Sequence, residues 1–311
     1  MDVDSFGDER TIIAGVPSLS ILILSIFFNA FSIYFVLTAK SLHSSFATIL
    51  VYRAICDVFV CSAITFFWFC SLLQYFPNLY VNVAISCTAE IFLTQAYMLH
   101  VTASVNRSVA IYFPIKCSQI YENWVVRVVS LLGTTVLSIA LVLLLLMDRC
   151  TLFVWVFGVT NFGVVLCEYD YSFANGVDVL WPFDLLVTAQ KALCFAAVAI
   201  DLATLFKILL ISKSVQSETN KRNIRFFLQV FTQNAFLCVG VLSGLFYPYD
   251  GKEHNYFGIY WYTGFLYNLS FFVNSITLFI FNSEVRQAIY GIFKPPTKVT
   301  FAVKVTSSSS P

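Results

Sequence analysis

Residues 11–39 read TIIAGVPSLSILILSIFFNAFSIYFVLTA and contain no Asp, Glu, Lys or Arg. A helix needs about 20 apolar residues to cross a bilayer, because hydrocarbon offers its backbone amides no partner outside the segment. These 29 residues therefore predict a membrane-spanning helix. Six further apolar stretches are long enough to span: 46–73, 87–113, 128–147, 185–212, 226–249 and 256–283.

The composition of the whole chain agrees with a membrane protein. Charged residues make up 11% of the 311 residues, against roughly 25% in soluble globular proteins. Apolar residues reach 59%, and the mean hydropathy is +0.81. The 18 basic and 17 acidic side chains are too few to cover a soluble surface. A net charge of +1 gives no excess of positive charge that would attract nucleic acid. We expect an all-α seven-transmembrane bundle in the lipid bilayer.

The connecting segments predict the orientation of the bundle. Twelve of the eighteen basic residues lie in one set of connections and the C-terminal tail, whereas Arg10, Arg149 and Lys252 lie in the opposite set. Lys and Arg accumulate on the cytosolic side, so we expect the N-terminus outside and the C-terminus in the cytosol. The predicted parts are an acidic extracellular N-terminus, the bundle, an amphipathic helix on the inner leaflet, and a disordered cytosolic tail (1–10, 11–283, 284–294 and 295–311).

Two ionisable residues lie one turn apart within the second predicted span. Arg53 and Asp57 are expensive to place in hydrocarbon, so they are candidates for function. A polar pair that only packs two helices together is the plainer alternative. The lone His100 of the third span has no metal-ligand spacing and is more typical of a packing or hydrogen-bonding group.

The third span ends in residues 105–114, VNRSVAIYFP. This segment resembles the end of the third helix in rhodopsin-like G-protein-coupled receptors, where an acid, an Arg and an aromatic residue precede a conserved Ala-Ile and Pro. Arg107 and Pro114 match that pattern, whereas Asn106 and Ser108 replace the acid and the aromatic residue. The resemblance implies a receptor that lends its cytosolic face to a heterotrimeric G protein.

Two other anchors of that family match in register. Asn29 lies 28 positions before Asp57, the separation that the family keeps between its first-helix Asn and second-helix Asp. Asn274 stands where the family's last helix has N-P-x-x-Y, with Ser275 in place of Pro. We expect Asn29, Asp57 and Asn274 to converge into a polar cluster that holds a sodium ion or water.

Three further segments narrow the resemblance to the nematode serpentine receptors of class X, over roughly residues 10–295. They are PIKCSQIY at 114–121, Asp201-x-x-Thr204-x-x-Lys207, and RNIRFFLQ-x-x-x-Q at 222–233. Members of that family are chemosensory receptors, mostly without known ligands. The implied residues for G-protein coupling are Arg107, Asn106, Pro114, Arg222 and Arg225.

The resemblance also implies a small-molecule pocket between the outer halves of the spans. Its expected polar anchors are Glu90, Thr94, Tyr97, Lys191 and Tyr247, among aromatic residues. Such a pocket suits a small, partly apolar molecule. Glu90 and Lys191 are equally well explained as charges at the membrane rim.

The chain has nine cysteines, most of them within predicted spans. An oxidising exterior and the precedent of the family favour a disulfide between Cys87 and Cys167. Cys150 competes for the same partner, so the pairing stays open.

Other functions fit the sequence less well. A transporter or channel subunit is the alternative, but a transporter would want repeats and broken helices at the midplane, and the chain offers no repeat. We expect no enzymatic activity and no bound metal or cofactor other than the sodium ion. The expected location is the plasma membrane, in a sensory cilium. Phosphates on Ser307–Ser310 would recruit arrestin, and a solvated end of the chain without such a role is the equal alternative.

Overall fold

The structure, a computed structural model, describes residues 9–38, 45–75, 77–113, 116–117, 120, 123–147, 151–156, 161–166, 181–211, 218–245, 256–281, 285–286 and 290. Seven long helices lie within these residues, and all seven are long and apolar enough to cross a membrane, which confirms the predicted number of spans. They are α1 (Glu9–Thr38), α2 (Ser45–Leu72), α3 (Leu79–Tyr112), α5 (Trp124–Met147), α6 (Trp181–Ile211), α7 (Glu218–Leu245) and α8 (Tyr256–Phe281).

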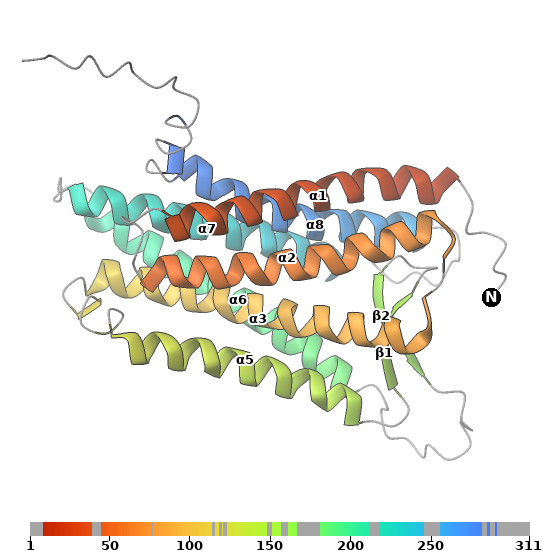
Figure 1. The fold of residues 1–311 in the computed structure, drawn as a ribbon. Coiled ribbons are helices and arrows are strands. Elements are labelled where there is room, and N and C mark those ends of the chain that lie inside the picture. The colour runs from red at the N-terminus through yellow and green to blue at the C-terminus, as the bar shows by residue number, and fades with distance from the viewer. Residues whose placement is uncertain are drawn as a thin grey trace, which may run out of the picture.

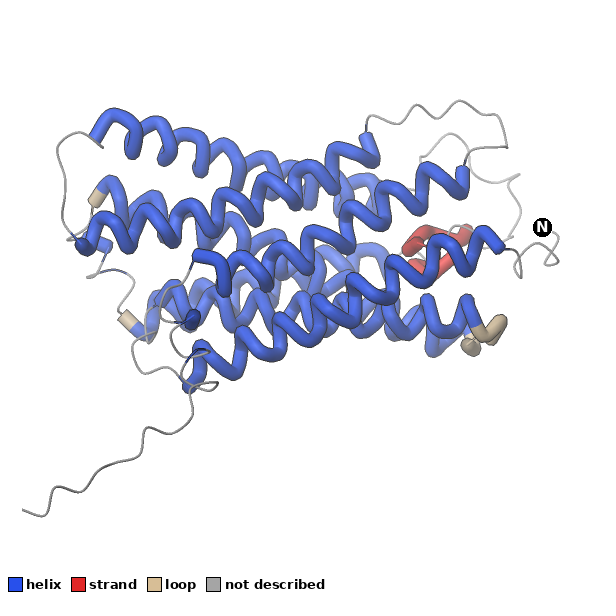
Figure 2. Tube along the Cα trace, turned by 90° about the horizontal axis from the view of Figure 1, so that it is seen from above, coloured by secondary structure: helices blue, strands red, loops and turns tan. Residues whose placement is uncertain are grey.

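The helices run side by side as one bundle (Figures 1 and 2). Helix α3 lies at its centre and packs against α2, α5, α6 and α7, while α1 packs between α2 and α8. The N-terminal end of α1 lies at the same end of the bundle as two short strands (Figure 1). We call this end the hairpin end, and the opposite one the Arg107 end.

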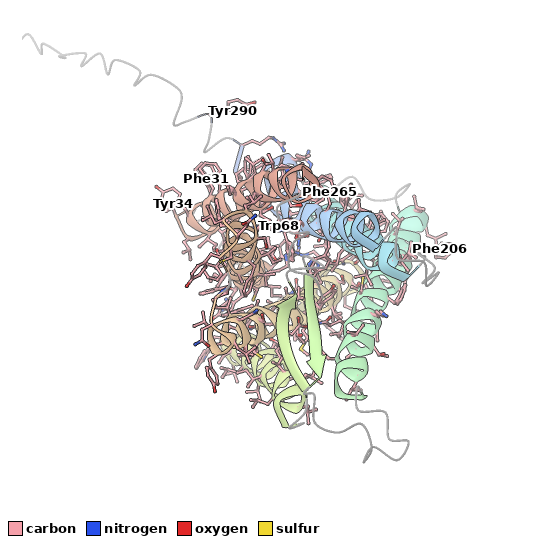
Figure 3. All side chains as sticks on the ribbon, turned by 90° about the vertical axis from the view of Figure 1, so that its right-hand side faces the viewer. Phe31, Tyr34, Trp68, Phe206, Phe265 and Tyr290 are labelled. Carbon is pink, nitrogen blue, oxygen red and sulfur yellow. The ribbon has the colours of Figure 1, made fainter. Side chains whose placement is uncertain are left out.

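The two strands correct the expectation of an all-α chain. Strands β1 (Thr151–Val156) and β2 (Asn161–Leu166) pair antiparallel, with Thr151 opposite Leu166 and Val156 opposite Asn161. The segment is rich in Val, Phe and Trp, which favour strands, but in so apolar a chain this composition did not stand out. The hairpin crosses the end of the bundle (Figure 3), and β1 packs against α3 and α5.

A turn at Gln74, Pro77 and Asn78 separates α2 from α3. Gln74 has φ of 53°, in the left-handed region, and Asn78 caps α3 by accepting a hydrogen bond from the backbone N–H of Tyr80 at 2.9 Å. Helix α3 therefore begins eight residues before the predicted Cys87. Asn82 is a buried residue of this added part of the helix.

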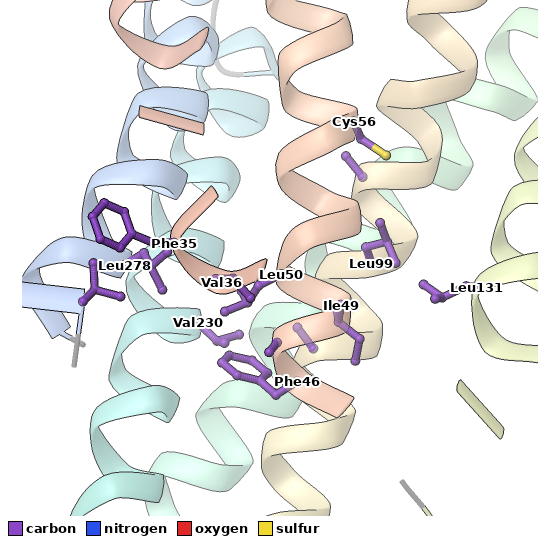
Figure 4. Packing of buried hydrophobic residues seen from close by; sticks show 14 residues of the cluster. Phe35, Val36, Phe46, Ile49, Leu50, Cys56, Leu99, Leu131, Val230 and Leu278 are labelled. Carbon is purple, nitrogen blue, oxygen red and sulfur yellow. The ribbon is translucent and has the colours of Figure 1, made fainter. Parts of the chain in front are cut away.

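Two apolar clusters fill the bundle, one toward each end. The cluster toward the Arg107 end joins six helices through Phe35, Phe46, Leu99, Leu131, Val230 and Leu278 (Figure 4). The cluster toward the hairpin end includes Leu22, Val60, Phe67, Leu237 and Phe271. Other large apolar side chains point outward, as Phe206 does at 65% exposure (Figure 3), which suits a surface solvated by lipid.

Some predicted parts fall outside the described residues. Of the expected surface helix at 284–294, the structure describes helical backbone at Val285, Arg286 and Tyr290. The N-terminal segment 1–8 and the tail 291–311 are not among the described residues.

Candidate functional site

Arg107 is buried near the C-terminal end of α3, against aromatic rings from two neighbouring helices. Its guanidinium carbon lies 3.5 Å from the centre of the Phe46 ring on α2 and 5.3 Å from the centre of the Phe226 ring on α7. Only 7% of Arg107 and 2% of Phe46 are exposed. The negative faces of the two rings attract the cation, so Arg107 ties α3 to α2 and α7.

The motif Asp201-x-x-Thr204-x-x-Lys207 places three side chains of α6 toward α3. The Thr204 and Ser108 hydroxyls lie 2.5 Å apart, and Lys207 Nζ lies 5.6 Å from the centre of the Tyr112 ring. The Tyr112 hydroxyl also donates to the carbonyl of Ala203 at 3.0 Å. These contacts fix the end of α6 against the end of α3 beside Arg107.

The structure describes only some of the other residues predicted for G-protein coupling. Asn106 is buried, with 1% of its surface exposed, and Arg225 is exposed on α7. Arg222 belongs to α7, but its side chain is not among those described, and Pro114 lies outside the described residues. Helix α7 begins eight residues before the predicted residue 226, so its basic segment is helical.

The middle of the bundle contains a polar layer between the two apolar clusters. The Asn274 amide on α8 donates to Asp57 Oδ2 at 3.3 Å and lies 3.4 Å from His100 Nε2 on α3. Arg53, one turn from Asp57, is 3% exposed. Asn29 is also buried, but its amide donates to the carbonyl of Ser25 in its own helix. The structure thus joins Asp57 and Asn274, while the bond made by Asn29 is local.

The polar layer continues from His100 toward α6 through Asn234 of α7. His100 Nδ1 lies 2.6 Å from Asn234 Oδ1. The Asn234 amide nitrogen donates to Ser104 Oγ at 2.7 Å and to Asp201 Oδ2 at 2.6 Å. His100 is therefore a hydrogen-bonding group, as its isolation in the sequence suggested.

The predicted pocket residues of α3 share one face in the half of the bundle nearer the hairpin. Glu90 is 5% exposed, and its Oε1 accepts hydrogen bonds from Gln190 of α6 and, at 3.4 Å, from Thr94. The Tyr97 hydroxyl donates to the Tyr267 hydroxyl of α8 at 3.4 Å. Glu90 is therefore buried among neutral partners.

Two predicted pocket residues do not join this group in the described structure. Lys191 follows Gln190 on α6 and is half-buried, whereas Tyr247 lies outside the described residues. The rim explanation for Glu90 is wrong, because its side chain is buried inside the bundle. Within the described part of the chain, no three His, Cys, Asp or Glu side chains gather as they would around a metal ion.

Cys87 is a free thiol inside the bundle. Its side chain packs with Val142 of α5 and Leu186 of α6. Its predicted partner Cys167 and the alternative Cys150 both lie outside the described residues, so the pairing stays a prediction. Because α3 begins at Leu79, Cys87 lies more than two turns into the helix.

Several residues of these sites were missed in the sequence. Phe46 and Phe226 are two among 33 Phe, and nothing in their spacing links them to Arg107. Asn234 directly follows Gln233, and Gln190 directly precedes Lys191, in otherwise apolar spans. A polar residue at membrane depth is costly unless it is bonded, and that cost was the one available signal for them.

The seven-helix bundle, with a buried Arg at one end of its central helix, defines a seven-transmembrane protein of the rhodopsin fold. The fold matches the crystal structure of squid rhodopsin with a TM-score of 0.68, over 91% of this chain and 85% of that chain, at 12% identity. The family described as "Serpentine type 7TM GPCR chemoreceptor Srx" matches residues 19–282. The chain belongs to this family of multi-pass membrane receptors.

A relative from Caenorhabditis elegans, serpentine receptor class X-43, is 25% identical over 213 residues. The match covers 66% of this chain and 63% of that relative, so the chain spans less than two thirds of the relative's length. The family and the fold are those of receptors, and they give no support to the transporter alternative.

Proposed function

We propose that this chain is a chemosensory receptor that binds a small molecule toward the hairpin end and activates a heterotrimeric G protein at the Arg107 end. The observation that carries the proposal is the position of Arg107, a buried cation against a ring of α2 and a ring of α7. A cation stored in this way can be released by moving one helix.

The release requires α7 to move away from α2 and α3. Such a movement carries Phe226 away from Arg107 and opens the Arg107 end. The five N–H donors of the guanidinium can then bind backbone carbonyls of a partner helix. Asn106 and Pro114 would shape the α3 side of that contact, and Arg222 and Arg225 would add positive charge on the α7 side.

The ligand is proposed to bind among Glu90, Thr94 and Tyr97, with Lys191 and Tyr247 as further polar contacts. Glu90 Oε1 bonds to neutral groups of Gln190 and Thr94. A carboxylate buried in this way favours a ligand that brings a hydrogen-bond donor or a positive charge. The Tyr97 and Tyr267 rings offer apolar surface beside it.

The remaining assignments follow from the basic residues and the family. The N-terminus is proposed to lie outside the cell and the C-terminus in the cytosol, in the plasma membrane of a sensory cilium. Residues 284–294 would rest on the inner leaflet, and phosphates in the tail would recruit arrestin. A sodium ion or water is proposed beside Asp57, whose Oδ1 is buried without a hydrogen-bond partner.

The test is nucleotide exchange on purified G proteins by the receptor in lipid nanodiscs, with a panel of small molecules as ligands. Arg107→Ala should abolish exchange while leaving ligand binding intact. Arg127→Ala, which removes a basic residue of α5, is the matched control and should exchange normally. Normal exchange by Arg107→Ala would contradict the proposal, and ligand uptake into sealed vesicles would favour a transporter.

A further inference from the structure

Five buried polar side chains form one hydrogen-bonded chain across the bundle, from α2 to α6. The order is Asp57 (α2), Asn274 (α8), His100 (α3), Asn234 (α7) and Asp201 (α6). Each of the five is at most 3% exposed. The chain thus links five helices in the layer between the two apolar clusters.

One arrangement of hydrogens satisfies the bonds around His100 and Asn234. The Asn234 nitrogen faces the Asp201 carboxylate and the Ser104 hydroxyl, so Asn234 Oδ1 faces His100. An amide oxygen only accepts, so the proton of neutral His100 sits on Nδ1, and Nε2 accepts from Asn274. Turning the Asn234 amide around would place its oxygen against the carboxylate, which is repulsive.

Asn234 holds the central place in this chain. Its amide uses both N–H groups and its oxygen, and its three bonds reach two helices other than its own. Moving α7 outward would leave an N–H of His100 and an oxygen of Asp201 without these partners. Asp201 Oδ1 already has no hydrogen-bond partner, so the loss would leave the whole carboxylate without a donor from α7.

We infer that Asn234 is a clamp that holds α7 against α3 and α6 while Arg107 is covered. This inference rests on the proposed function, because the helix that it holds is the one whose movement uncovers Arg107. It explains how the closed state is kept although Asn106 offers no carboxylate to Arg107. In this protein, the amide of Asn234, deep in the bundle, contributes to the stability of the closed state.

The first test compares four variants by ligand-free nucleotide exchange in nanodiscs. Asn234→Leu removes all three bonds and should raise exchange about three- to thirtyfold, since one average hydrogen bond between membrane helices is worth about a factor of three. Asp201→Leu should raise exchange in the same direction. Asp201→Asn should stay near wild type, because its amide oxygen still accepts from Asn234. Gln95→Leu is the matched control, since it removes a buried amide bond of 2.7 Å between α3 and Thr135 of α5 and should change nothing.

The second test measures helix position without any G protein. Spin labels at Val125 of α5 and Arg225 of α7, both exposed at the Arg107 end, report the distance between these helices in a background whose reactive cysteines are serine. Asn234→Leu and Asp201→Leu should populate longer distances, while Asp201→Asn and Gln95→Leu keep the wild-type distribution.

The outcomes separate the clamp from the proposed function. Longer distances in the leucine variants without any exchange would support the clamp and contradict the coupling. Wild-type distances in both leucine variants would overturn the clamp, whatever the exchange rates are. If Asn234→Leu fails to fold, the comparison of Asp201→Leu with Asp201→Asn decides in the same way, because only the first removes the acceptor.

Discussion

The guanidinium carbon of Arg107 lies 3.5 Å from the centre of the Phe46 ring. In the rhodopsin-like receptors that the third span resembles, this Arg follows an acidic residue, whereas here it follows Asn106, and two aromatic faces attract the guanidinium. A desolvated cation–π contact is worth about 2 kcal/mol. Losing one such contact would shift the equilibrium between the closed and the open state about thirtyfold. The closed state is therefore stabilised by a small free energy, and we expect measurable ligand-free signalling.

Phe46→Leu should raise ligand-free nucleotide exchange, by up to about thirtyfold if the whole contact is lost. Leucine keeps the apolar bulk but lacks the negative ring face that attracts Arg107. Phe59→Leu is the control, because Phe59 lies on the same helix and stacks on Phe92 with the ring centres 4.3 Å apart, away from Arg107. Equal exchange by both variants would show that the Phe46 ring contributes only packing.

Asn106→Asp should lower ligand-free exchange. The new carboxylate would stand beside Arg107 in a buried place, where a charge-assisted bond is about twice as strong as a neutral one. Exchange at saturating ligand should fall less, because the binding of the ligand still supplies free energy for the movement of α7 that opens the Arg107 end. An unchanged basal rate would mean that the carboxylate at residue 106 does not reach the guanidinium of Arg107. The double variant of Asn106→Asp and Arg107→Lys would in that case give no information on their pairing.

Asp57→Asn should change basal exchange or the response to ligand while surface expression stays near wild type. If a sodium ion lies beside Asp57, the wild-type receptor should melt about 2–4 °C higher in sodium chloride than in choline chloride of equal ionic strength. That difference should vanish in Asp57→Asn. Equal melting temperatures in both salts would indicate water at this position, with Arg53 as the cation that balances Asp57.

The number of spans was predictable because a membrane leaves the sequence little freedom. Every spanning segment must be apolar and at least about 20 residues long, and all seven predicted stretches meet this requirement. The hairpin β1–β2 was missed since the strands lie in a connection, where apolar residues say nothing about crossing. Its pairing depends on packing against α3 and α5, which no local pattern contains.

The residues proposed to function were predictable only where a family pattern marks them. Arg107, Asp57 and Asn274 stand in such patterns, and the last two are joined in the structure. Phe226 and Asn234 act on α3 from another helix, across more than a hundred residues of sequence. Contacts of this kind depend on how helices pack face to face, and spacing along one helix does not show them.

Gly240→Ala should destabilise the receptor, because α7 and α8 approach closely there. A Cβ at Gly240 would lie 3.3 Å from the backbone Cα of Tyr267, so the two helices would have to separate. We expect a loss of about 1–2 kcal/mol. Gly133→Ala is the matched control, since its Cβ would meet nothing within 4 Å, and it should be neutral or stabilise α5 by up to about 1 kcal/mol. Reaction of the buried thiols with a fluorescent reagent during heating measures both.

Glu90→Gln should weaken ligands that carry a positive charge and spare neutral ones. The substitution keeps the size of the side chain and an oxygen that accepts from Gln190 and Thr94, so the variant should fold and show wild-type basal exchange. A charge-assisted bond to a buried carboxylate is worth about 1.5–3 kcal/mol, so the half-maximal concentration of an amine should rise about tenfold or more, whereas that of the matching alcohol should stay within about twofold. Thr88→Val is the control, because Thr88 is an exposed residue of the same helix. If amines and alcohols are weakened alike, Glu90 contributes to the shape of the pocket and its charge plays no part in recognition.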